Sequence, residues 1–192
     1  GKSNTYKENA LSEIYVNSGS LYERGFLEGQ APHVWEDQGI PYFVDESLLI
    51  GERKFGHLII EAGAVLSFSE EKSIEVEEHA AVLEVNGTSD NPVSLEGRNG
   101  VGSWNGVWVE TNASKNRITH ATITDAGQKA IAYWFSQGAA LSLGYSTSTT
   151  QIRLENVTLT NSGGCGIAES GNVTINSTNL QFSNISGNQY CN

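Results

Sequence analysis

Apolar runs that recur along the chain are the feature that most restricts how it can fold. Residues 117–124 align with residues 153–160 at an offset of 36 positions, and a looser copy covers residues 177–187. Within each copy apolar and polar side chains alternate, as in a half-buried β-strand. Repeats of roughly 20 to 50 residues are typical of solenoids. Strand-like runs joined by turns, with no helical segment between them, favour an all-β solenoid over a leucine-rich or ankyrin array.

The spacing between matching residues predicts the size of one coil. Ile131 follows Val107 by 24 residues, Ile167 follows Ile131 by 36, and Cys191 follows Ile167 by 24. These steps predict coils of about 24 residues, with an insertion of about 12 residues around 135–150. Inward side chains of stacked coils should form aliphatic ladders, and Gly and Asn at the strand ends should take the positive-φ bends. The expected ladder residues are Val107, Val109, Ile118, Ile123, Ile131, Leu154, Leu159 and Ile167.

The beginning of the chain lacks this pattern. A solenoid exposes its core at both ends, so we expect residues 1–40 to form an N-terminal cap or a leading coil. The parallel β-helix then covers residues 41–192. Residues 6–16 fit either a short amphipathic helix or a strand that begins at Tyr15.

The chain is strongly acidic. Its formal net charge is −11, from 22 acidic and 11 basic side chains. Nucleic acids are bound by neutralising phosphates with Lys and Arg, and anionic membranes attract basic segments, so both partners are disfavoured. No apolar run approaches the ~18 residues that indicate a membrane-spanning helix. A cation or a neutral partner suits this charge better than a polyanion does.

Two cysteines, Cys165 and Cys191, lie near the C-terminal end, 26 residues apart. Since this spacing is about one coil, we expect a disulfide between neighbouring coils, which would imply export from the cytosol. The alternative is a pair of buried free thiols. No CxxC or Cys/His pattern accompanies the cysteines, which argues against a metal site.

Three segments carry a resemblance to a known family. They are residues 57–86 (HLIIEAGAVLSFSEEKSIEVEEHAAVLEVN), 87–97 (GTSDNPVSLEG) and 104–109 (WNGVWV). They resemble the repeat region of secreted bacterial right-handed parallel β-helix proteins, a group similar in fold to the pectate lyases. The resemblance covers residues 40–190 and implies a single-stranded right-handed parallel β-helix. It implies no single activity, because such domains occur in lyases, hydrolases and adhesins.

Aromatic side chains supply the candidate ligand-binding residues, which are Trp108, Tyr133 and Trp134. If the valines on either side of Trp108 point inward, Trp108 points outward. Exposed rings on a rigid sheet suit stacking against sugar rings, and exposed apolar patches commonly mark binding sites. The alternatives are that Tyr133 follows Ile131 into the core and that the insertion covers Trp108.

A candidate acid/base set consists of Arg117, His120 and Asp125. The resemblance implies such a role, because polysaccharide lyases of this fold typically combine a basic proton abstractor with calcium-binding carboxylates. The closely spaced Asp pairs of the related hydrolases are missing from the sequence. Arg117 also recurs as Arg153 at the same repeat position, which a structural ladder explains equally well.

Two acidic residues are the candidate metal ligands. Glu75 and Glu77 stand at i and i+2 of one expected strand, so both point outward. Their oxygens would suit calcium, and no other cofactor is expected. The alternative is a solvated outer face that keeps the sheet from aggregating.

These observations give one leading hypothesis and two alternatives. The leading hypothesis is a non-catalytic, secreted or cell-surface β-solenoid module that binds carbohydrate or a cell-surface partner, as a monomer or as part of a longer chain. The first alternative is a polysaccharide lyase or glycoside hydrolase of the pectate-lyase-like fold. The second is a structural stalk.

Overall fold

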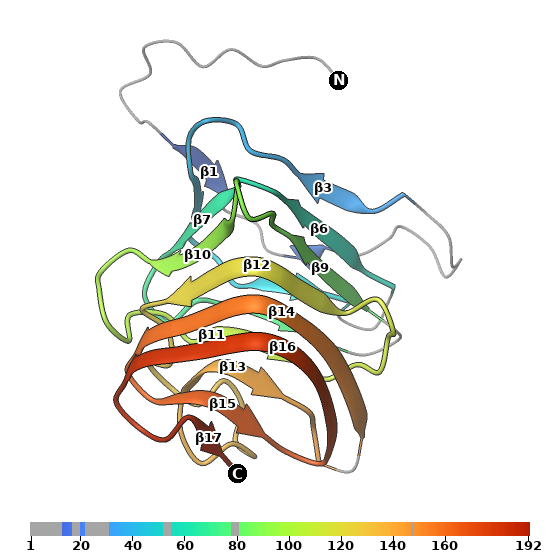
Figure 1. Cartoon of the computed structure of the whole chain (residues 1–192), viewed down its shortest axis with the longest axis vertical. Coiled ribbons are helices and arrows are strands. Elements are labelled where there is room, and N and C mark those ends of the chain that lie inside the picture. The colour runs from blue at the N-terminus through green and yellow to red at the C-terminus, as the bar shows by residue number, and fades with distance from the viewer. Residues whose placement is uncertain (1–12, 17–19, 22–30, 52–54, 78–80, 147) are drawn as a thin grey trace.

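The computed structural model describes residues 13–16, 20–21, 31–51, 55–77, 81–146 and 148–192 (Figure 1). Within them the chain forms seventeen β-strands and no helix, and therefore no helix that is long and apolar enough to cross a membrane. Successive turns of about 26 residues stack into a parallel β-solenoid of about 6 turns. The all-β solenoid expected from the repeats is confirmed.

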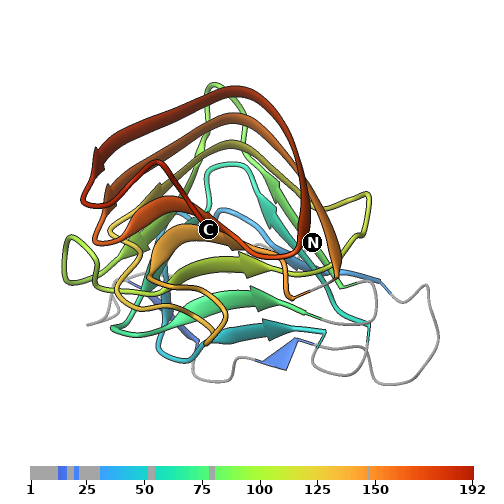
Figure 2. The same cartoon turned by 90° about the horizontal axis from the view of Figure 1, so that it is seen from below.

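Each turn has three sides, here called faces 1, 2 and 3, which follow one another along the chain (Figure 2). Face 1 contains β3 (His33–Trp35), β6 (His57–Glu61), β9 (Val82–Asn86) and the first parts of β12 (Arg117–Thr124), β14 (Thr149–Ser162) and β16 (Asn172–Ile185). Face 2 contains β1 (Ile14–Val16), β4 (Tyr42–Val44), β7 (Val65–Phe68), β10 (Val93–Gly97) and the last parts of β12, β14 and β16. Face 3 contains β2 (Ser20–Leu21), β5 (Leu48–Ile50), β8 (Ser73–Val76), β11 (Gly106–Val109), β13 (Ala139–Leu143), β15 (Cys165–Glu169) and β17 (Tyr190–Cys191).

Ladders of aliphatic side chains fill the interior, with one residue from each turn. The ladder on face 1 is Ile60, Val85, Ile118 and Leu154. The ladder on face 2 is Leu66, Leu95, Ile123 and Leu159. The ladder on face 3 is Leu48, Ile74, Val107, Leu141 and Ile167. All of these side chains are fully buried, and burying each one contributes about 1.5–3 kcal/mol.

The strand register confirms most of the expected ladder and corrects one step of it. Residues 117–124 pair with residues 153–160 at the predicted offset of 36. The next partner of Val107 is Leu141 rather than Ile131. After Thr124, paired residues in these two turns are only 26 positions apart, as the pairing of Ala139 with Cys165 shows.

The extra residues therefore lie at 125–138, before β13, and not around 135–150. The sequence around Ile131 resembles that of a strand, because its Gly-x-x-x-Ile-Ala pattern matches the one around Ile167, which lies in β15. The more apolar run Ala139–Leu143 occupies the sheet instead, with all five residues buried.

The beginning of the chain contributes to the solenoid. β1, β2 and β3 pair in parallel with β4, β5 and β6. Tyr15 thus belongs to a strand, and the remainder of the possible helix, residues 6–12, lies outside the described residues. Trp35 and Tyr42 stack with their ring centroids 5.1 Å apart.

Polar side chains occupy the corner between faces 1 and 2. His120, Asn156 and Asn179 stack there in successive turns with φ of 44°, 53° and 53°. The Asn179 side-chain Nδ2 donates to Asn156 Oδ1 at 2.8 Å, and Asn156 Nδ2 lies 3.1 Å from His120 Nε2. Asn tolerates positive φ better than most residues do, so the expected Asn bends are confirmed. A second corner repeats the arrangement with Asp125, Asn161 and Asn184.

The corner can be tested at Asn156. Asn156→Ala and Asn156→Gly remove the same hydrogen bonds, but only alanine carries a Cβ that is strained at positive φ. We expect the alanine variant to lose about 1 kcal/mol more of the free energy of unfolding than the glycine variant, measured by urea denaturation. Thr174→Ala, at an exposed position of β16, should change stability by less than about 0.5 kcal/mol. Equal stability of the two Asn156 variants would contradict the strained bend.

Candidate functional site

The clearest candidate site lies on the outside of face 3, where residues 125–138 form a loop over the sheet. This segment is called the cover loop. Trp108 points outward from β11 beneath it, because the valines on either side belong to the inner core. Only 5% of Trp108 is exposed, since it packs against Phe135 and a group of small residues. The Trp108 indole nitrogen also donates to the carbonyl oxygen of Gly144 at 3.0 Å.

The cover loop is held at both ends. The Gln128 amide donates to the Trp104 carbonyl at 3.0 Å, and the Cys165 amide donates to the Gly138 carbonyl at 2.8 Å. The expected Cys165–Cys191 disulfide is confirmed, with Cα atoms 6.3 Å apart. Both cysteines join the apolar cluster beneath the loop. The loop is therefore packed on a small second core rather than extended into solvent.

Three aromatic rings meet above this small second core. Trp134 contacts Tyr133 at a centroid distance of 4.7 Å and Tyr145 at 4.4 Å, both with edge-to-face geometry. The ring centroid of Trp134 also lies 5.4 Å from that of Trp108. Tyr133 is 88% exposed and Tyr145 is 38% exposed, while Trp134 is half-buried. Tyr133, Trp134 and Tyr145 are called the aromatic cluster.

Trp108 lies beneath the cover loop, as the alternative for this residue had it, so it supports the aromatic cluster and offers no open ring to a ligand. Tyr133 points into solvent, as a ligand-binding candidate must, and does not follow Ile131 into the core. Tyr145 was missed, because only the correct register of β13 shows that the residue after Gly144 returns to Trp134.

The candidate metal ligands lie beside this region. Glu75 is the strand partner of Trp108, and its Oε1 accepts a hydrogen bond from Ser73 Oγ at 2.5 Å. Glu77 follows the end of β8, and its amide donates to the Ile50 carbonyl at 3.0 Å. Across the described part of the chain, no three His, Cys, Asp or Glu side chains gather closely enough to hold a metal ion.

Arg117 belongs to a separate charged group on face 1. Its Nη2 lies 2.5 Å from Glu84 Oε2, and its Nε donates to Asn86 Oδ1 at 2.9 Å. His57 Nε2 lies 2.7 Å from the other oxygen of Glu84. The Glu84 side chain is only 7% exposed, so the ion pair with Arg117 and the contact with His57 satisfy a nearly buried carboxylate. Neither His57 nor Glu84 stands out in the sequence, because their partners lie in other turns.

The three expected acid/base residues do not come together. His120 and Asp125 sit at two different corners, each with positive φ. His120 contacts Asn156, and Asp125 accepts a hydrogen bond from Thr124 Oγ1 at 3.1 Å. Arg117 lies on the flat part of face 1 with Glu84. The three side chains therefore have separate contact partners in the structure.

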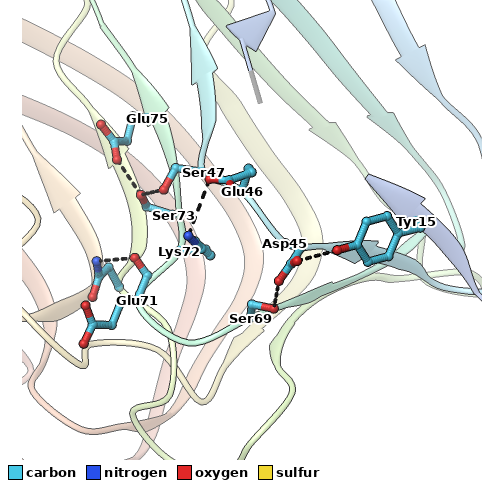
Figure 3. Close-up of polar contacts among 10 residues, drawn as sticks. Tyr15, Asp45, Glu46, Ser47, Ser69, Glu71, Lys72, Ser73 and Glu75 are labelled. Carbon is cyan, nitrogen blue, oxygen red and sulfur yellow. Dashed lines mark hydrogen bonds and ion pairs between the residues drawn. The ribbon is translucent and has the colours of Figure 1, made fainter. Parts of the chain in front are cut away.

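A second polar group follows the corner between faces 2 and 3 (Figure 3). Tyr15 donates a hydrogen bond to Asp45 Oδ2, and Ser69 Oγ donates to Asp45 Oδ1 at 2.6 Å. The bond from Ser69, followed by the one from Tyr15, lowers the pKa of Asp45 below its ordinary value of 3.8. The same contact with Asp45 raises the pKa of Tyr15 above 10.0. These contacts tie successive turns to one another.

No protein-family model matches the chain, and no curated protein and no solved structure shows significant similarity to it.

The disulfide should make a measurable contribution to stability. It closes a 26-residue segment between β15 and β17, and closing a loop of this length is worth about 3 kcal/mol. We expect Cys165→Ala/Cys191→Ala to lose about this amount in guanidinium unfolding. Wild-type protein treated with dithiothreitol should shift in the same direction, while the double variant should not respond. An unchanged wild-type midpoint under reduction would contradict the prediction.

The Asp45 contacts should give stability a defined dependence on pH. Because the folded-state pKa lies below 3.8, the stabilisation is fully present above that pH and is lost as pH falls through the folded-state pKa. Asp45→Asn should therefore be less stable than wild type at pH 6, and the difference should shrink as the pH is lowered through this range. Urea unfolding at several pH values measures both proteins. A difference that stays constant down to about pH 2.5 would contradict the lowered pKa.

Proposed function

We propose that the protein is a secreted or cell-surface β-solenoid module that binds carbohydrate through the aromatic cluster, without catalysis. The observation that carries the proposal is the 88% exposure of Tyr133 next to Trp134 on an anchored loop. A large ring left in solvent loses the benefit of burial. Exposed apolar surface of this kind commonly marks a binding site.

The chemistry of the cluster suits a sugar. The Tyr133 and Tyr145 side chains combine an apolar ring with a hydroxyl group, which matches the apolar faces and hydroxyl groups of a pyranose, while Trp134 supplies ring surface and keeps its indole nitrogen buried. Because the cover loop is already anchored at both ends, little conformational entropy is lost when a ligand binds to it. With a net charge of −11, neutral or amino sugars are better partners than polyuronates.

The disulfide supports the proposed location. Disulfides persist in oxidising compartments and are rare in the cytosol, so Cys165–Cys191 fits an exported protein.

We further propose that the solenoid is right-handed and related to the pectate-lyase-like proteins. Parallel strands joined by crossovers are right-handed in about 98% of cases, and the segments around residues 57–109 resemble that group.

A lyase remains the competing hypothesis, because Arg117 is half exposed beside His57 and Glu84. The ion pair with Glu84 and the hydrogen bond to Asn86 hold the Arg117 guanidinium in place, which opposes a role as proton abstractor. Binding alone is therefore the better proposal.

The test combines a glycan array with a lyase assay. We expect neutral or amino-sugar glycans to bind, and Tyr133→Ala to weaken the strongest of them at least about fivefold in calorimetry. Tyr15→Ala, at an exposed tyrosine of face 2 (51% exposed), should bind as wild type does. Absence of glycan binding, or equal binding by Tyr133→Ala, would refute the proposal. Unsaturated uronate products that disappear with Arg117→Ala would instead identify a lyase.

A further inference from the structure

Three Asn-Gly dipeptides occur in the chain, at residues 86–87, 99–100 and 105–106. In such a dipeptide the amide nitrogen of the glycine can attack the side-chain carbonyl carbon of the asparagine. Glycine favours this attack, because it has no Cβ to hinder the approach of its own nitrogen and its backbone adapts easily. The fold surrounds the three dipeptides differently, and it therefore decides which of them can react.

The first dipeptide lies at the end of β9 and is held from both sides. Asn86 Oδ1 accepts a hydrogen bond from Arg117 Nε at 2.9 Å. The Gly87 amide donates to the Thr119 carbonyl at 3.0 Å, and a Cβ placed on Gly87 would lie 2.0 Å from the His120 carbonyl oxygen. The attacking nitrogen is thus bonded to the next turn, with no space in which to rearrange.

The third dipeptide leads into β11 and is held as firmly. Asn105 Nδ2 donates to the Glu71 carbonyl at 2.9 Å, and Asn105 Oδ1 is buried. Gly106 is buried and pairs with Ser73 of β8. A Cβ placed on Gly106 would lie 2.5 Å from the Ala139 carbonyl oxygen. The side chain and the glycine are therefore both fixed by neighbouring turns.

The second dipeptide lies in the turn between β10 and β11, which projects from the corner between faces 2 and 3 (Figure 1). Asn99, Gly100 and Val101 are all exposed. Within the part of the chain that the structure describes, the Gly100 amide has no hydrogen-bond partner. Apart from the two adjacent residues, no atom lies within 4 Å of the position that a Gly100 Cβ would take. Here the nitrogen and the space around it are both open.

We propose that Asn99 is a site of spontaneous deamidation, with water as the only co-reactant. Hydroxide removes the proton of the Gly100 amide, and the nitrogen forms a bond to Asn99 Cγ. The bond from Cγ to Nδ2 breaks, and the side-chain nitrogen takes a proton from water and leaves as ammonia, which regenerates the hydroxide. Water then opens the resulting succinimide ring at either carbonyl carbon. One opening gives aspartate, and the other gives isoaspartate, in which the main chain runs through Cγ.

The modification would change the surface at this corner. Asn99 Nδ2 now donates to Glu70 Oε1 at 3.1 Å. Deamidation replaces this donor with a carboxylate, so attraction to Glu70 becomes repulsion between like charges. Each event also adds one negative charge to a chain whose formal net charge is already −11. This inference does not depend on the proposed sugar binding.

Peptide mapping by mass spectrometry tests the proposal on the folded 192-residue chain, incubated at mildly alkaline pH in water enriched in heavy oxygen. We expect Asn99 to convert at least about tenfold faster than Asn86 and Asn105, because those two must first be released by local opening of the sheet. Aspartate and isoaspartate should both appear, each with one heavy oxygen atom, at a rate that rises with pH. Gly100→Ala should slow the conversion at least about tenfold, since a Cβ hinders the nitrogen.

The unfolded chain supplies the matched control. In urea with dithiothreitol, the three Asn-Gly dipeptides should convert at rates within about threefold of one another, because the contacts that protect two of them are lost. Equal rates at the three sites in the folded chain would overturn the proposal. So would the same ranking in urea, which would place the difference in local sequence, or conversion at Asn99 without isoaspartate, which would exclude the succinimide.

Discussion

In-register stacking of neighbouring turns is the constraint on which the rest of the structure depends. Each strand obtains its main-chain hydrogen bonds from the turns before and after it, so a residue on one turn is placed by its partner on the next. Val107 lies between Ile74 and Leu141 in this way. A solenoid has little other long-range contact to correct an error. Register therefore decides which side chains meet on the outer faces.

The cover loop shows what happens where one turn is longer than its neighbours. Ten additional residues fit between β12 and β13 relative to the next turn, as the change of offset from 36 to 26 shows. The sheet beneath keeps its spacing, and the excess chain folds outward onto Trp108. Regular turns thus supply the support, and the irregular one supplies the candidate site.

The residues that point inward could be predicted from the sequence, because the alternation of apolar and polar side chains depends only on neighbouring residues of one strand. The match between residues 117–124 and 153–160 placed Ile118 and Ile123 correctly. The outer faces did not follow, because contacts there join residues 27 or 30 positions apart, such as His57 with Glu84 and Tyr15 with Asp45. Spacing between turns varies, so one wrong step at Ile131 displaced the expected insertion. The 88% exposure of Tyr133 likewise depends on the path of the loop rather than on its composition.

The disulfide has a mechanical consequence for the two ends of the molecule. Each turn is held mainly by its neighbours, so a force applied along the axis would peel turns one at a time from an end. At the C-terminal end, Cys165–Cys191 joins β15 to β17 covalently, so a force applied there passes directly to β15 and the residues between the cysteines carry no load. Among the described residues no such bond joins the first turns. A pull on the C-terminal end would therefore release less chain than a pull on the N-terminal end before the inner turns are loaded, and the mechanical response would have a direction.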